Sequence, residues 1–366
     1  MTLESVSIQR RPAMGVTRRE VLQGAAALSL ASSLSSEVHA KENLTVLEFP
    51  KPYVDASKRL AEKWDKTDIN WAVHVGGGAA ALGKIKAVWP NSPYDLIGEW
   101  SAVFPAMIKE GWLEAVTLTD VPNLAGVPER FLAKDDNGNI KSIPRSINGG
   151  FFAVRTDRCP IEIKAIEDLL NPKLKSQISW PLPTTYSNMA TVTLALGRGG
   201  NEFNMDPGWK FLEELAKSGN IGRVYHSAVQ NQNAMTTGEI SISYVGTDSL
   251  TAVANRVPMK ALTKVDPSLK AAQYVEGWVV MANSKNKKDA MEFANFMVSK
   301  ENAELFNELT GGVPANQKAK ASAGAAPLQY TPEEHDKFAY LPDWAYMSTQ
   351  LNDWVKKFEQ DIVPKI

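Results

Sequence analysis

Three consecutive glycines, Gly76 to Gly78, stand between a strand-like stretch and a run of helix-forming residues. Glycine has no Cβ atom, so backbone N–H groups can approach a ligand closely, and a helix N-terminus favours negative charge. The spacing matches neither the dinucleotide-binding fingerprint nor the P-loop. The segment therefore predicts either an anion site or a tight strand-to-helix turn that holds no ligand.

Arg145, in the stretch "IPRSING", is the cation best suited to an anionic ligand. A guanidinium can hold a carboxylate or a phosphonate through two parallel hydrogen bonds. The alternatives are a surface charge or an ion pair with Asp135 or Asp136. Residues 184–188, "TTYSN", offer further side-chain donors, although they also suit an ordinary helix N-cap.

Acidic and aromatic residues follow several predicted strands. Glu48 and Glu99 each stand at a strand end and could meet an ammonium group, and Trp100 could form a wall of the same pocket. Surface placement is the alternative for each of these three residues. Trp278 fits the protein core as well as it fits a cleft.

Catalytic and metal-binding motifs are absent from the sequence. No serine lies in a GxSxG pattern, and no HExxH or CxxC pattern occurs. Cys159 precedes Pro160 and has no neighbour in sequence that would activate it. Beyond the first forty residues, the histidines are His74, His226 and His335, which show no metal-ligand spacing. We therefore expect no enzyme activity, no metal and no cofactor.

The first forty residues are predicted to be an export signal. Paired arginines, Arg18 and Arg19, precede a short, uncharged apolar stretch and a small-x-small site at residues 38–40. The apolar stretch is too short for a permanent membrane span. The segment resembles twin-arginine signals, although Glu20 and Val21 depart from that pattern, so Sec export stays open. An N-terminal helix of the mature fold is the other alternative.

Composition excludes some classes of partner. The chain has 366 residues and a net charge of −1, with 40 basic and 41 acidic residues. Nothing in this balance demands nucleic acid or an acidic membrane surface. A single cysteine permits no internal disulfide. Cleavage after Ala40 would leave residues 41–366, a length that favours two domains.

Short apolar runs alternate with amphipathic stretches from Leu44 onward, which predicts a doubly wound α/β fold. In such folds, ligands bind at the carboxyl ends of the strands. Asn137 and Gly138 predict a hairpin-type turn. Asp206 is a candidate N-cap, with Pro207 as the first helical residue. The first predicted elements are strands at 43–49, 69–75 and 94–100 and helices at 54–66, at 80–89 and from 102 to an end at Gly111.

From Leu44 to about Ala315, the chain resembles the bacterial extracellular solute-binding proteins of ABC importers, in the branch of spermidine-putrescine and ferric-iron binders. The resemblance is carried by the order of the stretches "YDLIGEWSAVFPAMIKEGWLEAV", "KSIPRSINGGFFAV", "IEDLLNPKLKSQI", "ATVTLALG", "TTGEISISYVGT" and "ENAELFNELTGGVPANQKA". It implies two α/β lobes, a hinge of two crossing strands near 149–154 and 276–280, and a ligand held in the cleft.

The resemblance also implies domain limits and partners. We expect a signal at 1–40, lobe 1 at 41–149, lobe 2 at 150–276, a return to lobe 1 at 277–316, and a C-terminal helical segment at 317–366 that packs on lobe 2. The expected partners are a small solute, an ABC permease and its ATPase. No lipobox cysteine follows the signal, so the resemblance implies a freely diffusing, monomeric periplasmic protein.

The solute is less clearly indicated. The two acidic positions of polyamine binders align with Thr184 and Ser187, so both charges are missing. Ferric-iron binders use adjacent tyrosines, and the sequence contains no such pair. The residues favour an anionic or zwitterionic solute. The alternatives are a polyamine, a sensory protein of the same fold that docks on a receptor, and, less favoured, an exported hydrolase.

Tyr53 and Tyr244 keep positions where polyamine binders place aromatic residues, whereas Glu276 and Trp278 match that family only loosely. The complete set of predicted ligand-binding residues is Glu48, Tyr53, Gly76, Gly77, Gly78, Glu99, Trp100, Arg145, Thr184, Thr185, Tyr186, Ser187, Tyr244, Glu276 and Trp278.

Overall fold

The computed structural model describes residues 43–74 and 77–366. The chain separates into two units, residues 1–41 and residues 42–366, and the second unit contains all of the described fold. The predicted export signal and Gly76 lie outside the described residues. Among the helices that are described, none is both long and apolar enough to cross a bilayer.

The described strands form one mixed sheet in the order β2-β1-β3-β9-β4-β7-β5-β6. Strands β2, β1 and β3 pair in parallel at one end, and β7, β5 and β6 pair in parallel at the other. This is the α/β class that the sequence predicts. The strands are β1 (Asn43–Glu48), β2 (Asp68–Val73), β3 (Leu96–Trp100), β4 (Ile143–Arg155), β5 (Ile178–Pro181), β6 (Ile221–Tyr225), β7 (Ile242–Gly246), β8 (Met259–Ala261), β9 (Ala271–Val280), β10 (Val313–Pro314) and β11 (Ala339–Tyr340).

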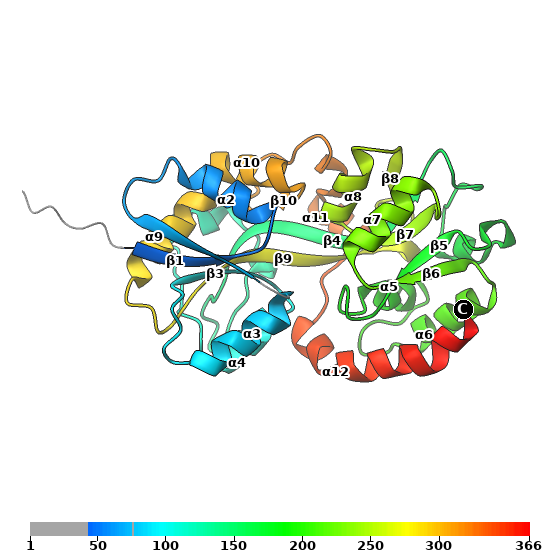
Figure 1. Cartoon of the computed structure of the whole chain (residues 1–366), viewed down its shortest axis with the longest axis horizontal. Helices are drawn as coiled ribbons and strands as arrows, with labels where there is room; N and C mark the ends of the chain where they lie inside the picture. The colour runs from blue at the N-terminus through cyan, green and yellow to red at the C-terminus, as the bar shows by residue number, and fades with distance from the viewer. Residues whose placement is uncertain (1–42, 75–76) are drawn as a thin grey trace, which may run out of the picture. The chain divides into compact units, whose positions relative to one another are not determined.

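Helices cover both faces of each parallel group (Figure 1). On the β1–β3 group, α2, α9 and α10 lie on one face and α3 and α4 on the other. The described helices are α2 (Tyr53–Ala61), α3 (Gly77–Val88), α4 (Phe104–Lys109), α5 (Met189–Gly197), α6 (Asp206–Lys217), α7 (Ala228–Thr237), α8 (Thr247–Ala254), α9 (Lys287–Met297), α10 (Lys300–Thr310), α11 (Pro332–Phe338) and α12 (Trp344–Lys357).

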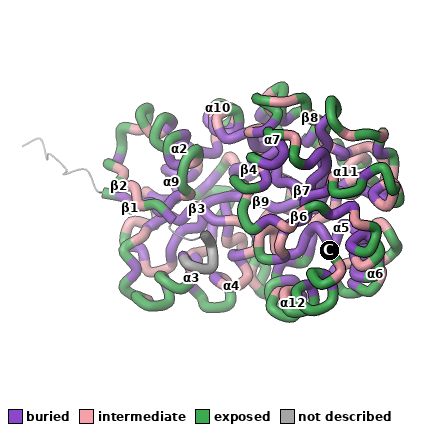
Figure 2. The backbone as a smooth tube through the Cα atoms, turned by 45° about the vertical axis from the view of Figure 1, so that its right-hand side comes forward, coloured by how far each residue is buried: buried purple, intermediate pink, exposed green. Residues whose placement is uncertain are grey.

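Two long strands, β4 and β9, connect the parallel groups. They pair antiparallel from Ile143 opposite Trp278 to Gly150 opposite Ala272. Every residue of both strands is buried, and Figure 2 shows this buried backbone along β9 and β7. Strands buried on both sides need continuous apolar or small residues, which explains the glycines at positions 149, 150 and 277.

Local chemistry explains several element boundaries. The predicted turn at Asn137 and Gly138 is confirmed: Gly138 has φ +81°, and Asp135 Oδ1 accepts the N–H of Asn137. The predicted N-cap at Asp206 is wrong, because α6 begins at Asp206 itself and follows Met205, which makes no side-chain cap. An acidic residue in the first turn still stabilises the helix through its dipole.

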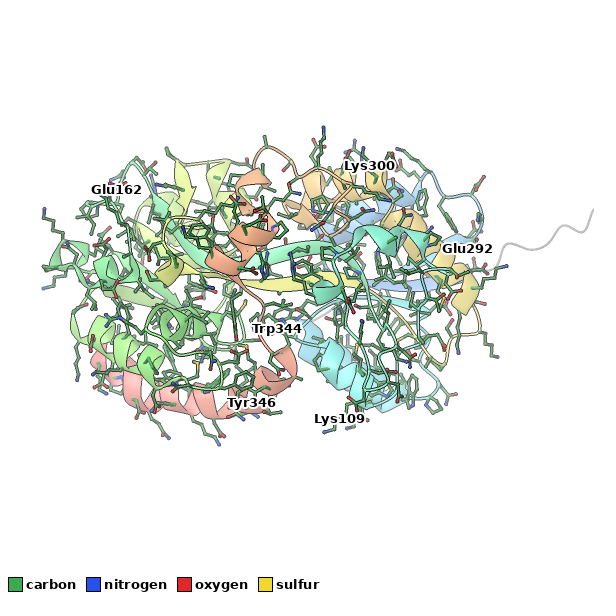
Figure 3. All side chains as sticks on the ribbon, turned by 180° about the vertical axis from the view of Figure 1, so that it is seen from behind. Lys109, Glu162, Glu292, Lys300, Trp344 and Tyr346 are labelled. Atoms are coloured by element: carbon green, nitrogen blue, oxygen red, sulfur yellow. The ribbon has the colours of Figure 1, made fainter. Side chains whose placement is uncertain are left out.

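The C-terminal segment runs alongside β9, where β11 pairs in parallel with Ala271 and Ala272. Helix α12 then buries Trp344, Met347 and Trp354 in the same core as Trp180 and Phe211. Figure 3 shows Trp344 beside the helix that carries Lys109. The segment therefore packs against residues from both parallel groups.

The close contact between β4 and β9 predicts a large effect of Gly277→Ala. A Cβ atom at Gly277 would lie 2.5 Å from the carbonyl oxygen of Ile143 and 2.9 Å from the α-carbon of Pro144, and these backbone atoms cannot move aside cheaply. We expect a loss of about 1–3 kcal/mol in the free energy of unfolding, measured by urea denaturation.

Gly83→Ala is the matched control, since a Cβ at Gly83 in α3 would meet no atom within 4 Å. We expect this variant to gain about 0.5–1 kcal/mol from helix propensity. Equal urea midpoints for the two variants would contradict the close strand contact.

Candidate ligand-binding site

Polar side chains gather at the carboxyl ends of β1, β2 and β3. Glu48 is the last residue of β1, His74 directly follows β2, and Glu99 is the penultimate residue of β3. All three are buried. Because the parallel strands end at one edge of the sheet, these groups meet there, at the place where α/β folds bind ligands.

Arg145 joins this group because of an irregularity in β4. Pro144 lies opposite Gly277 and Ser146 opposite Glu276, so Arg145 is an extra residue in the ladder. Such bulges redirect a side chain. Nη1 and Nη2 of Arg145 donate to the two carboxylate oxygens of Glu48 at 2.6 and 2.9 Å.

The Arg145 side chain is only 3% exposed, and the rings of Trp278 and Phe306 lie 4.6 and 4.5 Å from its guanidinium carbon. The predicted role as a free cation for an anionic ligand is therefore not supported. Pairing with Asp135 or Asp136 is wrong as well: Arg145 pairs with Glu48, 97 residues away, while Lys141 pairs with Asp135.

Glu99 and His74 form a buried neutral pair. Burial raises the pKa of Glu99 to about 8, and burial also lowers the pKa of His74. His74 Nε2 lies 2.8 Å from the carbonyl oxygen of Gly98, which can only accept, so this nitrogen carries the proton. His74 Nδ1 is then an acceptor, 3.4 Å from Glu99 Oε1, and neither atom has a hydrogen-bond partner.

Glu276 lies in the middle of the site, on β9. Its Oε1 accepts from the hydroxyl of Tyr53 at 3.4 Å, whereas its Oε2 is buried without a partner. Burial raises the pKa of Glu276 to about 7; Arg145 lowers it, and the charges of Asp248 and Glu48 raise it. A buried carboxyl group with a free oxygen is costly unless a donor or a cation reaches it.

Asp248, in the first turn of α8, adds to the site a side chain from the β5–β7 group. Its side chain is half-buried, and burial raises its pKa. Its charge also raises the pKa values of Tyr53, Tyr186 and Tyr274, after burial as the main cause. These side chains are therefore close enough to form one cluster.

The cluster holds more carboxyl groups than basic side chains. Its carboxyl groups are Glu48, Glu99, Asp248 and Glu276, and Nη1 and Nη2 of Arg145 both donate to Glu48. Within residues 43–74 and 77–366, no lysine or arginine forms an ion pair with Glu99, Asp248 or Glu276. The site is thus suited to a positively charged group.

The loop at 184–188 contributes donors in an unusual conformation. Ser187 and Asn188 have φ of 49° and 63°, in the left-handed region that non-glycine residues rarely adopt. Asn188 precedes α5 but makes no side-chain cap; instead, its Oδ1 accepts from Thr191. Thr185 Oγ1 and Asn188 Nδ2 are buried without partners, and Thr184 is exposed.

Tyr186 closes one side of the cluster. Its hydroxyl accepts the N–H of Gly246 at 3.0 Å, and its ring packs against Tyr244 with centroids 6.1 Å apart. Trp100 packs edge-on against Tyr274, with centroids 5.5 Å apart. Trp100 and Tyr186, which are partly exposed, can cover an apolar chain between polar groups of a ligand.

Two of the predicted ligand-binding residues lie beneath other residues of the site and support them. Tyr244 and Trp278 are completely buried; Tyr244 packs under Tyr186, and Trp278 packs under Arg145. Gly77 and Gly78 form the start of α3, so the glycines do lead directly into a helix.

Sequence inspection missed His74 and Asp248 as members of the site. His74 directly follows β2 and Asp248 lies two residues after β7, so both stand at the carboxyl ends of strands, as Glu48 and Glu99 do. That position was the available signal. It was not decisive for Asp248 because an acidic residue in the first turn of a helix is also a common stabilising feature.

A model of the family described as "Bacterial extracellular solute-binding protein" matches residues 60–332. The chain belongs to the bacterial extracellular solute-binding protein family. Proteins of this family act outside the cytoplasm, in the periplasm or the extracellular space. A search of curated proteins gave no match to this solute-binding protein.

Solved structures share the fold of this solute-binding protein at low identity. An ABC transporter protein from Clostridium perfringens has a TM-score of 0.71 and 22% identity, covering 87% of this chain and 99% of the other. The spermidine/putrescine binding protein PotD from Streptococcus pneumoniae, in complex with calcium and HEPES, has a TM-score of 0.70 and 17% identity. The match covers 87% of this chain and 100% of PotD. AgtB from A.tumefacien R10, in complex with agropinic acid, has a TM-score of 0.64 and 19% identity. The match covers 88% of this chain and 99% of AgtB. The predicted two-lobed fold is confirmed.

The Glu48–Arg145 pair predicts a strong energetic coupling. We expect Arg145→Met to lower the free energy of unfolding by about 3–5 kcal/mol, because Glu48 would remain buried without its cation. The double variant Glu48→Gln/Arg145→Met should recover part of this loss. Urea denaturation of the parent, both single variants and the double variant gives the coupling, and additive losses would contradict the pair.

The raised pKa values predict a pH-dependent stability. Glu99 and Glu276 hold their protons more tightly in the folded protein than at the ordinary pKa of 4.5, so their contribution is fully present below pH 4.5 and is lost as pH rises through about 7 and 8. We expect the free energy of unfolding of Glu276→Gln to exceed that of the parent by about 1–3 kcal/mol at pH 8 and to match it at pH 5. Thermal unfolding without added solute measures both; a constant difference across this range would refute the assignment.

Proposed function

We propose that this protein is the periplasmic solute-binding component of an ABC importer and that it captures a small solute carrying a protonated amine. The family supports solute binding, and several structural relatives are described as ABC-transporter proteins. The observation that carries the amine is the set of Glu99, Asp248 and Glu276, for which the described residues supply no cation.

Electrostatics favours a cationic over an anionic group at this site. An anion beside Glu99, Asp248 and Glu276 would disfavour their ionised forms, and Nη1 and Nη2 of Arg145 could reach it only by leaving both oxygens of Glu48. An ammonium group would donate to the free Glu276 Oε2 and would favour the ionised form of each carboxyl group. The initial preference for an anionic head is therefore replaced.

The aromatic residues suggest the shape of the solute. Tyr53, Trp100, Tyr186 and Tyr274 surround the acidic groups and are suited to methylene groups and to cation–π contact. A diamine or polyamine has this pattern of charged ends and an apolar chain. The acidic groups lie elsewhere than the aligned positions Thr184 and Ser187, which is why sequence alignment disfavoured a polyamine.

Capture would proceed by closure of two lobes. Tyr53 and Glu99 come from the β1–β3 group, whereas Tyr186 and Asp248 come from the β5–β7 group. An amine that contacts both sets stabilises the closed form by its differential affinity, and β4 and β9 supply the hinge. The closed form would then dock on a permease and its ATPase. The proposal also holds that the leader is removed and that the protein diffuses freely as a monomer.

A binding role, not catalysis, is proposed. Cys159 is the only cysteine; its Sγ donates to the carbonyl of Ile161, and burial raises its pKa, so it is a poor nucleophile. The described residues hold no cluster of three or more His, Cys, Asp or Glu residues that could bind a metal.

Calorimetric titration with putrescine and spermidine at pH 7.5 tests the proposal. We expect binding that Glu276→Gln and Asp248→Asn each weaken at least tenfold, because each removes a charge that pairs with the ammonium group. Glu359→Gln, which removes an exposed carboxyl group from the C-terminal helix, should bind like the parent.

Glutarate, a flexible dianion of similar length to putrescine with carboxylates at its two ends, is the control solute and should not bind at this site. Binding of glutarate that Glu276→Gln strengthens, together with no binding of either amine, would overturn the amine assignment. It would leave solute binding by the family intact.

A further inference from the structure

A cavity lies on the face of the hinge strands opposite to the acidic cluster. Side chains alternate along β9, so Tyr274 and Glu276 face the acidic cluster while Gln273 and Val275 point the other way. Gln273 and Ile147, which belongs to β4 and pairs with Val275, border a cavity of about 500 Å³. This volume is in the range of small-molecule sites.

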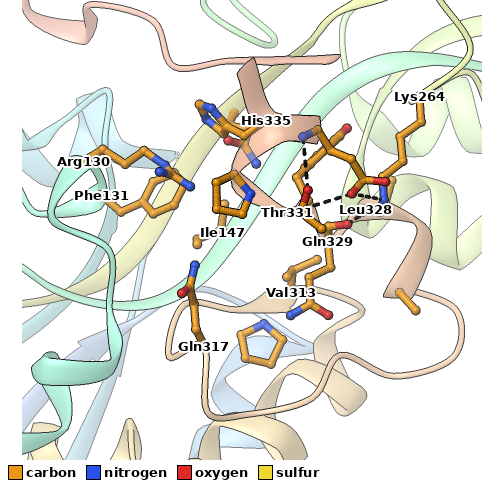
Figure 4. A pocket seen from close by; sticks show the side chains of 16 residues that line it. Arg130, Phe131, Ile147, Lys264, Val313, Gln317, Leu328, Gln329, Thr331 and His335 are labelled. Atoms are coloured by element: carbon orange, nitrogen blue, oxygen red, sulfur yellow. Dashed lines mark hydrogen bonds and ion pairs between the residues drawn. The ribbon is translucent and has the colours of Figure 1, made fainter. Parts of the chain in front are cut away.

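One wall of this cavity carries an unpaired cation. Arg130 extends over the ring of Phe131, with its guanidinium carbon 5.1 Å from the ring centroid, and reaches toward the middle of the cavity (Figure 4). Among the residues that the structure describes, no carboxylate forms an ion pair with Arg130. Its donors are free for a ligand.

Two polar side chains that border the same space each hold a buried atom without a partner. Gln273 is 4% exposed, borders the cavity, and its Oε1 has no hydrogen-bond partner. The side chain of His335, on α11, is 12% exposed, and its Nε2 is buried and unpartnered. Such orphaned groups are unfavourable unless a ligand or water satisfies them.

The rest of the cavity lining is apolar, and hydrogen bonds fix the residues at its rim. Phe131, Ile147, Val313, Pro314 and Leu328 supply the apolar surface. At the rim, Lys264 Nζ donates to Gln329 O and to Glu334 Oε2, both at 2.8 Å, and Thr331 with Glu334 forms the capping box of α11 (Figure 4). The rim lysine is neutralised by Glu334, so Arg130 dominates the charge of the cavity.

We propose that this cavity is a second ligand site, which binds a small monocarboxylate with an apolar body. Arg130 holds the carboxylate, the amide nitrogen of Gln273 donates to it, water satisfies Gln273 Oε1 and His335 Nε2, and the apolar residues contact the remainder of the molecule. The charge preference is opposite to that of the acidic cluster, so the two sites discriminate between ligands. A ligand here contacts β4, β9 and the 130–131 loop together, which places it on the hinge.

Benzoate and hexanoate are suitable probes, used with the purified protein in calorimetry or ligand-observed NMR. We expect binding of at least one of them and a tenfold or greater weakening in Arg130→Gln. Gln273→Met, which keeps the volume and removes the amide, should also weaken binding. Gln273 does not border the adjacent groove of about 1000 Å³ that Arg130 also touches, so this variant identifies which cavity is occupied.

Three controls make the test specific. Arg256→Gln removes another exposed arginine and should bind the probes like the parent. Benzyl alcohol, which lacks the carboxylate, should bind more weakly than benzoate. Glu276→Gln should leave benzoate binding unchanged while it weakens amine binding.

Absence of carboxylate binding at millimolar concentration would overturn the proposal. Binding that Arg130→Gln and Gln273→Met leave unchanged would do so as well. Either result concerns only the cavity bordered by Arg130 and Gln273, because amine binding at the acidic cluster is measured separately.

Discussion

The buried pair of Glu48 and Arg145 determines the electrostatic character of the site. Both terminal nitrogens of this guanidinium donate to one carboxylate, and the rings of Trp278 and Phe306 cover the group, so Arg145 can form the same paired hydrogen bonds with a second anion only if it releases Glu48. The pair also spans two strands, since Glu48 ends β1 and Arg145 is the bulged residue of β4. It therefore fixes the sheet edge where Glu276 lies and leaves the remaining carboxyl groups in excess.

The excess of carboxyl groups over basic side chains connects the folding stability of the protein to ligand binding. Carboxyl groups such as Glu99 and Glu276 are kept protonated near neutral pH by burial, and a cation that enters the site favours their ionised forms. In the proposed function, an amine removes the electrostatic cost of ionising these carboxyl groups. Because Asp248 and Tyr186 come from the other parallel group, an amine would contact all of these groups only when both sides of the site are together, which would link binding to closure.

The sequence predicted the elements better than the contacts among them. Alternating apolar patterns placed the strands that carry Glu48 and Glu99 and the helix after Gly77, because these features depend on neighbouring residues. The partner of Arg145 lies 97 residues away, and the bulge that redirects Arg145 depends on its register with β9. Neither can be derived from local pattern. Whether an acidic residue stands alone or in a cluster, as Asp248 does, is likewise a tertiary property.

The most direct measurement is the number of protons released when putrescine binds at pH 7, obtained by calorimetry in two buffers of different ionisation enthalpy. Putrescine is already protonated at this pH, so any released proton must come from the protein. With pKa values of about 8 for Glu99 and about 7 for Glu276, we predict release of about one proton, reduced in Glu276→Gln. Binding with no proton release, or with proton uptake, would contradict an acidic site that an amine ionises.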